Sequence, residues 1–134
     1  MKSVNVVLDT NIIVSAALSP GRNASDILLA AITGRFNFYY DYRIAEEYYK
    51  VMHYPKFGFE EWEIDAILDP LLKHGIPIHA KTLQGIQFTD ESDRKFYEVA
   101  KTVGAILVTG NLKHYPADGT ALSPSDFLAL LASG

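Results

Sequence analysis

Three acidic residues in distant parts of the chain have positions that suit chemistry. Asp9 follows the apolar run 4–8, and parallel sheets carry their sites at the carboxyl ends of such strands. Glu47 lies in a predicted helix, and Asp93 lies in the first turn of another. Carboxylate oxygens are the ligands that Mg²⁺ prefers. A cation held by them can activate water and stabilise charge on a phosphoryl oxygen.

Helical geometry separates Glu47 and Asp93 from the acids beside them. At about 100° per residue, Glu47 falls at the edge of the apolar stripe of its helix, whereas Glu46 points nearly opposite and should face solvent. Asp93 aligns with the apolar face that continues at Phe96, and Asp90 lies farther from that face as a natural N-cap. An inward carboxylate is costly unless something pairs with it, and a bound cation is one such partner.

Each of these acids also has a plain structural explanation, and the residue types alone leave both explanations open. Asp9 fits a turn, Glu47 fits the boundary of a helix, and Asp93 fits the positive end of a helix dipole. The histidines show no metal-ligand spacing, and we interpret them as surface, boundary or loop residues: His53, His74, His79 and His114. For His114, which follows Asn111 closely, a position at the mouth of the site is an alternative, but a plain loop position is the simpler interpretation.

The bulk composition restricts the function classes. The 134 residues suit a single domain over 1–134, and the hydrophobic content of 49% suits a packed core. The absence of cysteine excludes disulfides, thiolate metal sites and a cysteine nucleophile. The formal net charge of −4 argues against a non-specific nucleic-acid binder, although a carboxylate site carries its own cations. Without a signal or a membrane-spanning stretch, we expect a cytoplasmic protein with no membrane contact.

Strands and helices alternate along the chain. Short apolar or aromatic runs predict strands at 4–8, 36–40, 76–78 and 105–109. Capping signals and apolar stripes predict helices at 23–33, 43–53, 60–74, 90–103 and from 123 onward. Asn23 is the expected cap of the first of these helices, and Pro70 predicts a kink or break in the third. This order predicts a three-layer α/β/α domain with a central, mostly parallel sheet.

Four segments of the chain form a recognisable set: VLDTNIIVS at 7–15, IAEEYYKVM followed by YPKF at 44–57, DESDRKF at 90–96 and LVTGN at 107–111. Together these segments resemble the PIN-domain family, and in particular its toxin-like branch of VapC-related ribonucleases. They occur in the family's order and spacing over almost the whole chain. Phosphate-loop, GxSxG, GxGxxG and HExxH motifs, which would indicate other enzyme classes, are absent.

The resemblance implies a set of site residues. Asp9, Glu47 and Asp93 would be the catalytic, metal-binding acids. Many members carry an aspartate where this chain has Asn111, which keeps an oxygen ligand for the metal but removes one negative charge. The resemblance also implies supporting residues around the acids, which we take to be Thr10, Asn11, Asp90 and Thr109.

The implied function is that of an Mg²⁺- or Mn²⁺-dependent endoribonuclease, in which a metal-activated water cleaves RNA. The resemblance further implies a toxin of a type II toxin–antitoxin module, with a homodimer and an antitoxin protein as partners. The aromatic-rich stretch 43–74 is the expected partner surface, with Tyr49 and Trp62 exposed on it.

Two other functions remain open at this point. One is a PIN-fold protein that has lost turnover and acts by binding a protein partner. The other is a different Mg²⁺ enzyme, such as a phosphomonoesterase, although no second aspartate follows closely behind Asp9.

Overall fold

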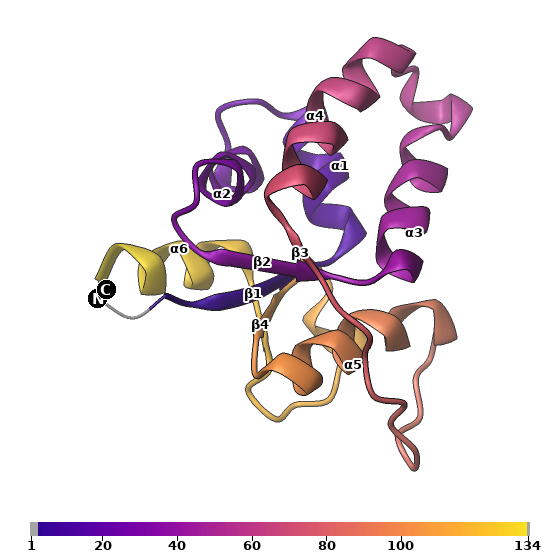
Figure 1. The fold of residues 1–134 in the computed structure, drawn as a ribbon, viewed down its shortest axis with the longest axis vertical. Helices are drawn as coiled ribbons and strands as arrows, with labels where there is room; N and C mark the ends of the chain where they lie inside the picture. Colours follow the sequence, from indigo (N-terminus) through magenta and orange to yellow (C-terminus); the bar gives the residue numbers. More distant parts are fainter. Residues whose placement is uncertain (1–2, 134) are drawn as a thin grey trace.

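The computed structural model describes residues 3–133, which form one five-stranded sheet with helices on both faces (Figure 1). The strand order is β3-β2-β1-β4-β5, and every pairing is parallel. The strands are β1 (Asn5–Leu8), β2 (Asn37–Tyr40), β3 (Ile76–Pro77), β4 (Ile106–Val108) and β5 (Ala121–Leu122). The predicted α/β class with a parallel central sheet is confirmed.

Helices form the two outer layers. Figure 1 shows α1 to α4 above the sheet and α5 below it, together with the long segment that follows β3. The α-helices are α1 (Thr10–Leu18), α2 (Asn23–Ile32), α3 (Tyr42–Met52), α4 (Glu61–His74), α5 (Arg94–Val103) and α6 (Pro124–Ser133). Short 3₁₀ turns stand at η1 (Pro55–Phe57), η2 (Glu91–Asp93) and η3 (Leu112–His114).

Strand β1 lies at the centre of the sheet and is covered on both faces. Val6, Val7 and Leu8 are fully buried, as expected for an apolar strand in a parallel sheet. Burying each such side chain stabilises the fold by about 1.5–3 kcal/mol. The backbone N–H of Asp9 donates to the carbonyl of Val108 at 3.0 Å, so the chain is still held by β4 where it leaves the sheet.

The predicted cap Asp90 and the predicted stop Gly104 are confirmed, whereas α3 has a cap that was not predicted. Asp41 caps α3, since its Oδ1 accepts from the backbone N–H of Ile44 at 3.0 Å. Asp90 caps η2, the turn that leads into α5. Gly104 ends α5 with φ +67°, a left-handed conformation that favours glycine.

Several expectations for the elements differ from the structure. Asn23 is the first residue of α2 rather than its cap, which is the extended Arg22. Helix α4 continues through Pro70, because Ile64, Leu68 and Leu71 are buried in the core and hold both halves of the helix in place. Helix α1 and strand β5 were not predicted. Strand β5 has only two residues, and α1 is apolar on nearly all sides and shows no helical stripe.

No helix within residues 3–133 has the length and apolar character needed to cross a membrane.

Candidate active site

Asp9 is the buried centre of the candidate site. It follows β1 at the start of α1, and only 6% of its surface is exposed. Its Oδ2 accepts hydrogen bonds from the Thr109 hydroxyl at 2.8 Å and the Tyr115 hydroxyl at 2.9 Å. Burial raises the pKa of Asp9, the two hydrogen bonds oppose that rise, and the charge of Glu47 adds to it.

Asp93 lies beside this centre, where η2 passes into α5. It is 9% exposed, and burial followed by the charges of Asp9 and Asp90 raises its pKa. His114 opposes that rise, because its Nδ1 lies 3.1 Å from Asp93 Oδ2. The interpretation of His114 as a plain loop residue is therefore wrong. Turn η3 brings the imidazole to the carboxylate although the loop itself is exposed.

Glu47 reaches the same region from α3, but its carboxylate already has partners. The Thr10 hydroxyl donates to Glu47 Oε2, and Lys95 Nζ lies 2.6 Å from Glu47 Oε1. The charge of Glu47 nevertheless contributes to the raised pKa of Asp9. Glu46 is exposed, as the helical geometry predicts.

The predicted supporting residues connect the start of α1 to the loop after β4. Asn11 Oδ1 accepts from the backbone N–H of Gly110 at 3.0 Å, and Asn11 Nδ2 donates to Thr109 Oγ1 at 3.4 Å. The backbone N–H of Asn111 also donates to that hydroxyl oxygen, at 3.0 Å. Thr109 thus links Asp9, Asn11 and residue 111, while the side chain of Asn111 is exposed on the same loop.

Asp90 supports the site indirectly. Its Oδ1 accepts from the backbone N–H of Ser92 at 2.9 Å and from the Ser92 hydroxyl at 2.8 Å. These bonds fix the turn whose last residue is Asp93.

Besides His114, two residues of the site were missed from the sequence, Tyr115 and Lys95. Tyr115 is 6% exposed, and its contact with Asp9 depends on the path of η3, which no sequence pattern indicates. Burial and the nearby carboxylates raise the pKa of the Tyr115 hydroxyl far above its usual value, so it acts as a hydrogen-bond donor. Lys95 follows Asp93 by two residues. Its ion pair with Glu47 depends on how α3 and α5 pack against each other.

The donor set fits a hard divalent cation at Asp9 and Asp93. Both groups offer carboxylate oxygens, and a cation would offset the burial and the neighbouring negative charges that raise their pKa values, Glu47 for Asp9 and Asp9 and Asp90 for Asp93. Within residues 3–133, no three His, Cys, Asp or Glu side chains are arranged to hold a metal ion. Glu47 would join the pair only by leaving Lys95. Metal binding by all three acids therefore stays a prediction.

Comparison with solved structures supports the fold. The crystal structure of PAE2754 from Pyrobaculum aerophilum matches with a TM-score of 0.66 and 16% sequence identity, and the match covers 98% of this chain and 91% of that one. At this level of identity the likeness concerns the fold. No curated protein matches the chain significantly.

Comparison with protein families covers most of the chain. The model of the PIN domain family matches residues 5–113, which include Asp9, Glu47, Asp93 and Asn111. The match begins with β1 and ends inside η3, so it contains the central strands and the acids at their carboxyl ends. The chain therefore belongs to the PIN domain family and has a nuclease-type fold.

Proposed function

We propose that this protein is a divalent-metal-dependent endoribonuclease. The observation that carries the proposal is the arrangement of Asp9. One carboxylate oxygen is fixed by the hydroxyls of Thr109 and Tyr115, and the charge of Asp9 helps to raise the pKa of the nearby Asp93. A fixed acid beside a second acid at the carboxyl edge of a parallel sheet is a suitable place for a cation and a phosphodiester.

Some residues of the site would hold the cation, and others orient the carboxylates that hold it. Asp9 and Asp93 would hold Mg²⁺ or Mn²⁺, with Glu47 as a third carboxylate. A cation bound there would supply positive charge to the phosphate oxygens and make a water molecule more acidic. Thr109 and Tyr115 orient Asp9, and His114 contacts Asp93 from the solvent side.

A cleavage assay tests this proposal. We expect wild-type protein to cut single-stranded or structured RNA with Mg²⁺ or Mn²⁺ and to stop when EDTA is added. Asp9→Asn and Asp93→Asn should each abolish cleavage, whereas Asp65→Asn, an exposed acid of α4, should cleave like the wild type. Cleavage by Asp9→Asn at the wild-type rate would refute the proposal.

The ion pair between Lys95 and Glu47 favours a second candidate, a PIN-fold binding protein with little or no turnover. In that protein the third carboxylate would serve structure rather than metal binding. Asn111, which lacks the charge of an aspartate, supports the same alternative. Purified protein that binds a protein partner but cleaves no RNA with either metal would establish it.

We further propose that the protein acts as the toxin of a type II toxin–antitoxin module, as a homodimer masked by an antitoxin. The exposed Trp62 and Tyr42, at 71% and 69%, support a partner surface on α3 and α4. Induced expression in a bacterial host should arrest growth, and the Asp9→Asn variant should not. Normal growth with active, soluble wild-type enzyme would exclude the toxin role.

A further inference from the structure

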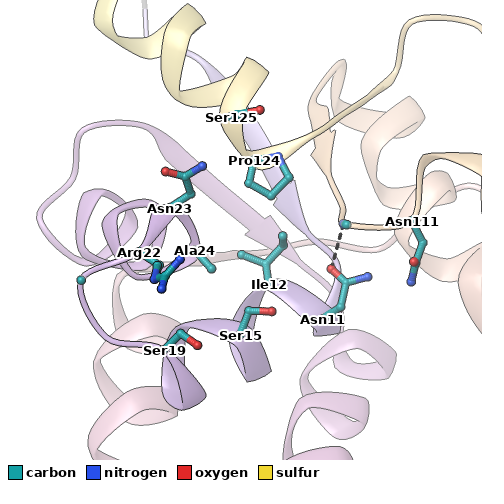
Figure 2. A pocket seen from close by; sticks show the side chains of 12 residues that line it. Asn11, Ile12, Ser15, Ser19, Arg22, Asn23, Ala24, Asn111, Pro124 and Ser125 are labelled. Carbon is teal, nitrogen blue, oxygen red and sulfur yellow. Dashed lines mark hydrogen bonds between the residues drawn. The ribbon is translucent and has the colours of Figure 1, made fainter.

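A groove of about 760 Å³ lies beside the acidic site. Figure 2 shows its lining from α1, the loop into α2, the loop after β4 and the start of α6. Asn11, Gly110 and Asn111 line the groove and also belong to the framework around Asp9. Its volume falls within the usual range of ligand pockets, roughly 300–1,000 Å³. A polymer that crosses the acidic site can therefore continue directly into the groove.

The chemistry of the lining suits a negatively charged, hydroxyl-bearing ligand. No carboxylate and no aromatic ring line the groove, although the chain as a whole has a formal net charge of −4. Arg22 supplies a positive charge, and none of the ion pairs within residues 3–133 includes it. The hydroxyls of Ser15, Ser19 and Ser125 supply further donors and acceptors.

The groove on the Glu47 side of the acidic site differs in the charges of its lining. A second groove, of about 440 Å³, lies beside Glu47. Its lining combines four cationic side chains with three carboxylates, which are Glu46, Glu47 and Glu91. Three of these cations, Arg43, Arg94 and Lys95, are already held in ion pairs, and the carboxylates repel phosphate groups. The acid-free groove with its unpaired Arg22 is therefore the better path for a phosphate backbone among the described residues.

We propose that the groove at Arg22 binds the sugar–phosphate backbone of the RNA nucleotides on one side of the scissile phosphate. This rests on the proposed ribonuclease function and adds the direction in which the strand leaves the site. Phosphate and sugar groups are the same in every nucleotide, so contacts of Arg22 and the serine hydroxyls with the backbone bind RNA without regard to base identity. Arg22 contacts phosphate, and the serine hydroxyls contact phosphate and sugar oxygens.

Binding measurements on a non-cleaving background test the proposal. In Asp9→Asn protein, the added substitution Arg22→Ala should weaken binding of fluorescent oligouridylate and oligoadenylate by the same factor, several-fold in fluorescence anisotropy. The slope of log K against log salt should fall by about 0.7 for each phosphate of the single strand that the variant no longer neutralises. Arg35→Ala is the matched control, since Arg35 is also exposed but lines a separate pocket. Equally weakened binding in both variants, or weakened binding of one sequence only, would overturn the proposal.

A blocking variant provides a second measurement. Ser15→Trp places a bulky side chain at an exposed position inside the groove and should raise KM for RNA while kcat and the circular dichroism stay near wild type. The two proposals fail in different ways. Arg22-dependent RNA binding without metal-dependent cleavage would refute the nuclease function and leave the groove in place. Cleavage with a KM unaffected by either Arg22→Ala or Ser15→Trp would refute the groove alone.

Discussion

The carboxylate of Asp9 is held by hydrogen bonds. Oδ2 accepts from the hydroxyls of Thr109 and Tyr115, and a hydrogen bond from the backbone N–H of Thr10 also lowers the pKa of the carboxyl group. The hydrogen bonds do not fully offset burial, so the pKa of Asp9 remains raised. The two hydroxyls therefore fix the orientation of the carboxylate through Oδ2.

Asp9→Asn should stabilise the metal-free protein at neutral pH. Because the pKa of Asp9 is higher in the folded than in the unfolded chain, folding favours the protonated acid. This contribution to stability is fully present below the unfolded pKa of about 3.9 and is lost as pH rises through the folded pKa. Asparagine, which is never charged, avoids that loss.

Urea unfolding at a series of pH values, with EDTA present, measures this effect. The free energy of unfolding of Asp9→Asn should exceed that of the wild type near pH 7, and the difference should shrink as the pH falls towards about 3.9. A less stable Asp9→Asn protein at pH 7 would instead indicate that the charged carboxylate serves mainly as a structural cap.

Asn111→Asp should tighten Mn²⁺ binding. The residue lies on the loop that Thr109 and Asn11 fix next to Asp9, and an aspartate would add a charged oxygen ligand. Isothermal titration of the two proteins gives the comparison, with Asp9→Asn as the variant expected to bind most weakly. Equal affinities for wild type and Asn111→Asp would place residue 111 outside the metal site.

Individual side chains of the site were predictable where a helical face or a strand end constrained them. Asp9 follows from the buried strand before it, and Asp93 from the apolar face of its helix. Tyr115 and Lys95 were not predictable, because their contacts depend on how separate segments pack rather than on a local period. His114 had the right neighbour in sequence, but nothing local indicated the direction of its ring.

At the scale of elements, α3 and α5 are joined by two ion pairs with reversed polarity. Glu47 of α3 meets Lys95 of α5, and Arg43 of α3 meets Glu98 of α5 at 2.9 Å. Glu98 is 2% exposed and also accepts from the backbone N–H of Leu83 at 2.9 Å. Sliding one helix along the other would break both ion pairs. Together the two ion pairs therefore fix the position of Glu47 relative to Asp93.

Lys95→Met should tighten divalent-metal binding if Glu47 is a ligand. The substitution removes the ammonium group that lies 2.6 Å from Glu47 and keeps a similar apolar stem. We expect a several-fold lower Kd for Mn²⁺ in isothermal titration. Lys101→Met, on the same helix but paired loosely with Asp118 at 3.7 Å, is the control. Unchanged or weaker binding by Lys95→Met would remove Glu47 from the ligand set.

The elements themselves were largely predictable from periodicity and capping residues. The apolar stripe and Asp41 cap of α3, and the glycine after α5, have local causes. Helix α1 was missed because it is buried on several sides and shows no polar face. The break predicted at Pro70 was wrong because tertiary packing of α4 outweighs the cost of a proline inside a helix, about 3 kcal/mol. The sheet order follows from long-range pairing, which local patterns do not encode.

At the scale of the whole molecule, the aromatic side chains of α3 and α4 separate into buried and exposed sets. Tyr48 is fully buried, whereas Trp62 is 71% exposed. Tyr49, expected on the partner surface, is half-buried, packs against the core, and its hydroxyl donates to Asp69 at 3.2 Å. A charge at Tyr49 would separate α3 from α4, so Tyr49 is unsuitable for testing an interface.

Trp62→Glu should shift the protein from dimer towards monomer if α4 forms the homodimer surface. A charged residue in place of an exposed ring removes an interface anchor without disturbing the core. Sedimentation velocity at several concentrations measures the shift, and circular dichroism checks the fold. Leu29→Glu is the control, since Leu29 is 61% exposed on α2. Wild-type protein that stays monomeric at high concentration would contradict this prediction.

The pairing of β1 with β4 has a consequence for the time at which the candidate site forms during synthesis. Asp9 and Thr109 are 100 positions apart, and Val6 pairs with Ile106. During synthesis from the N-terminus, β1 and α3 leave the ribosome long before β4 exists, so no nascent segment can orient Asp9. Closing so long a loop also makes this pairing a late and slow step of folding. The hydrogen bonds that orient Asp9 therefore form only after Thr109 and Tyr115 have been synthesised, and the proposed ribonuclease activity would begin no earlier than that point.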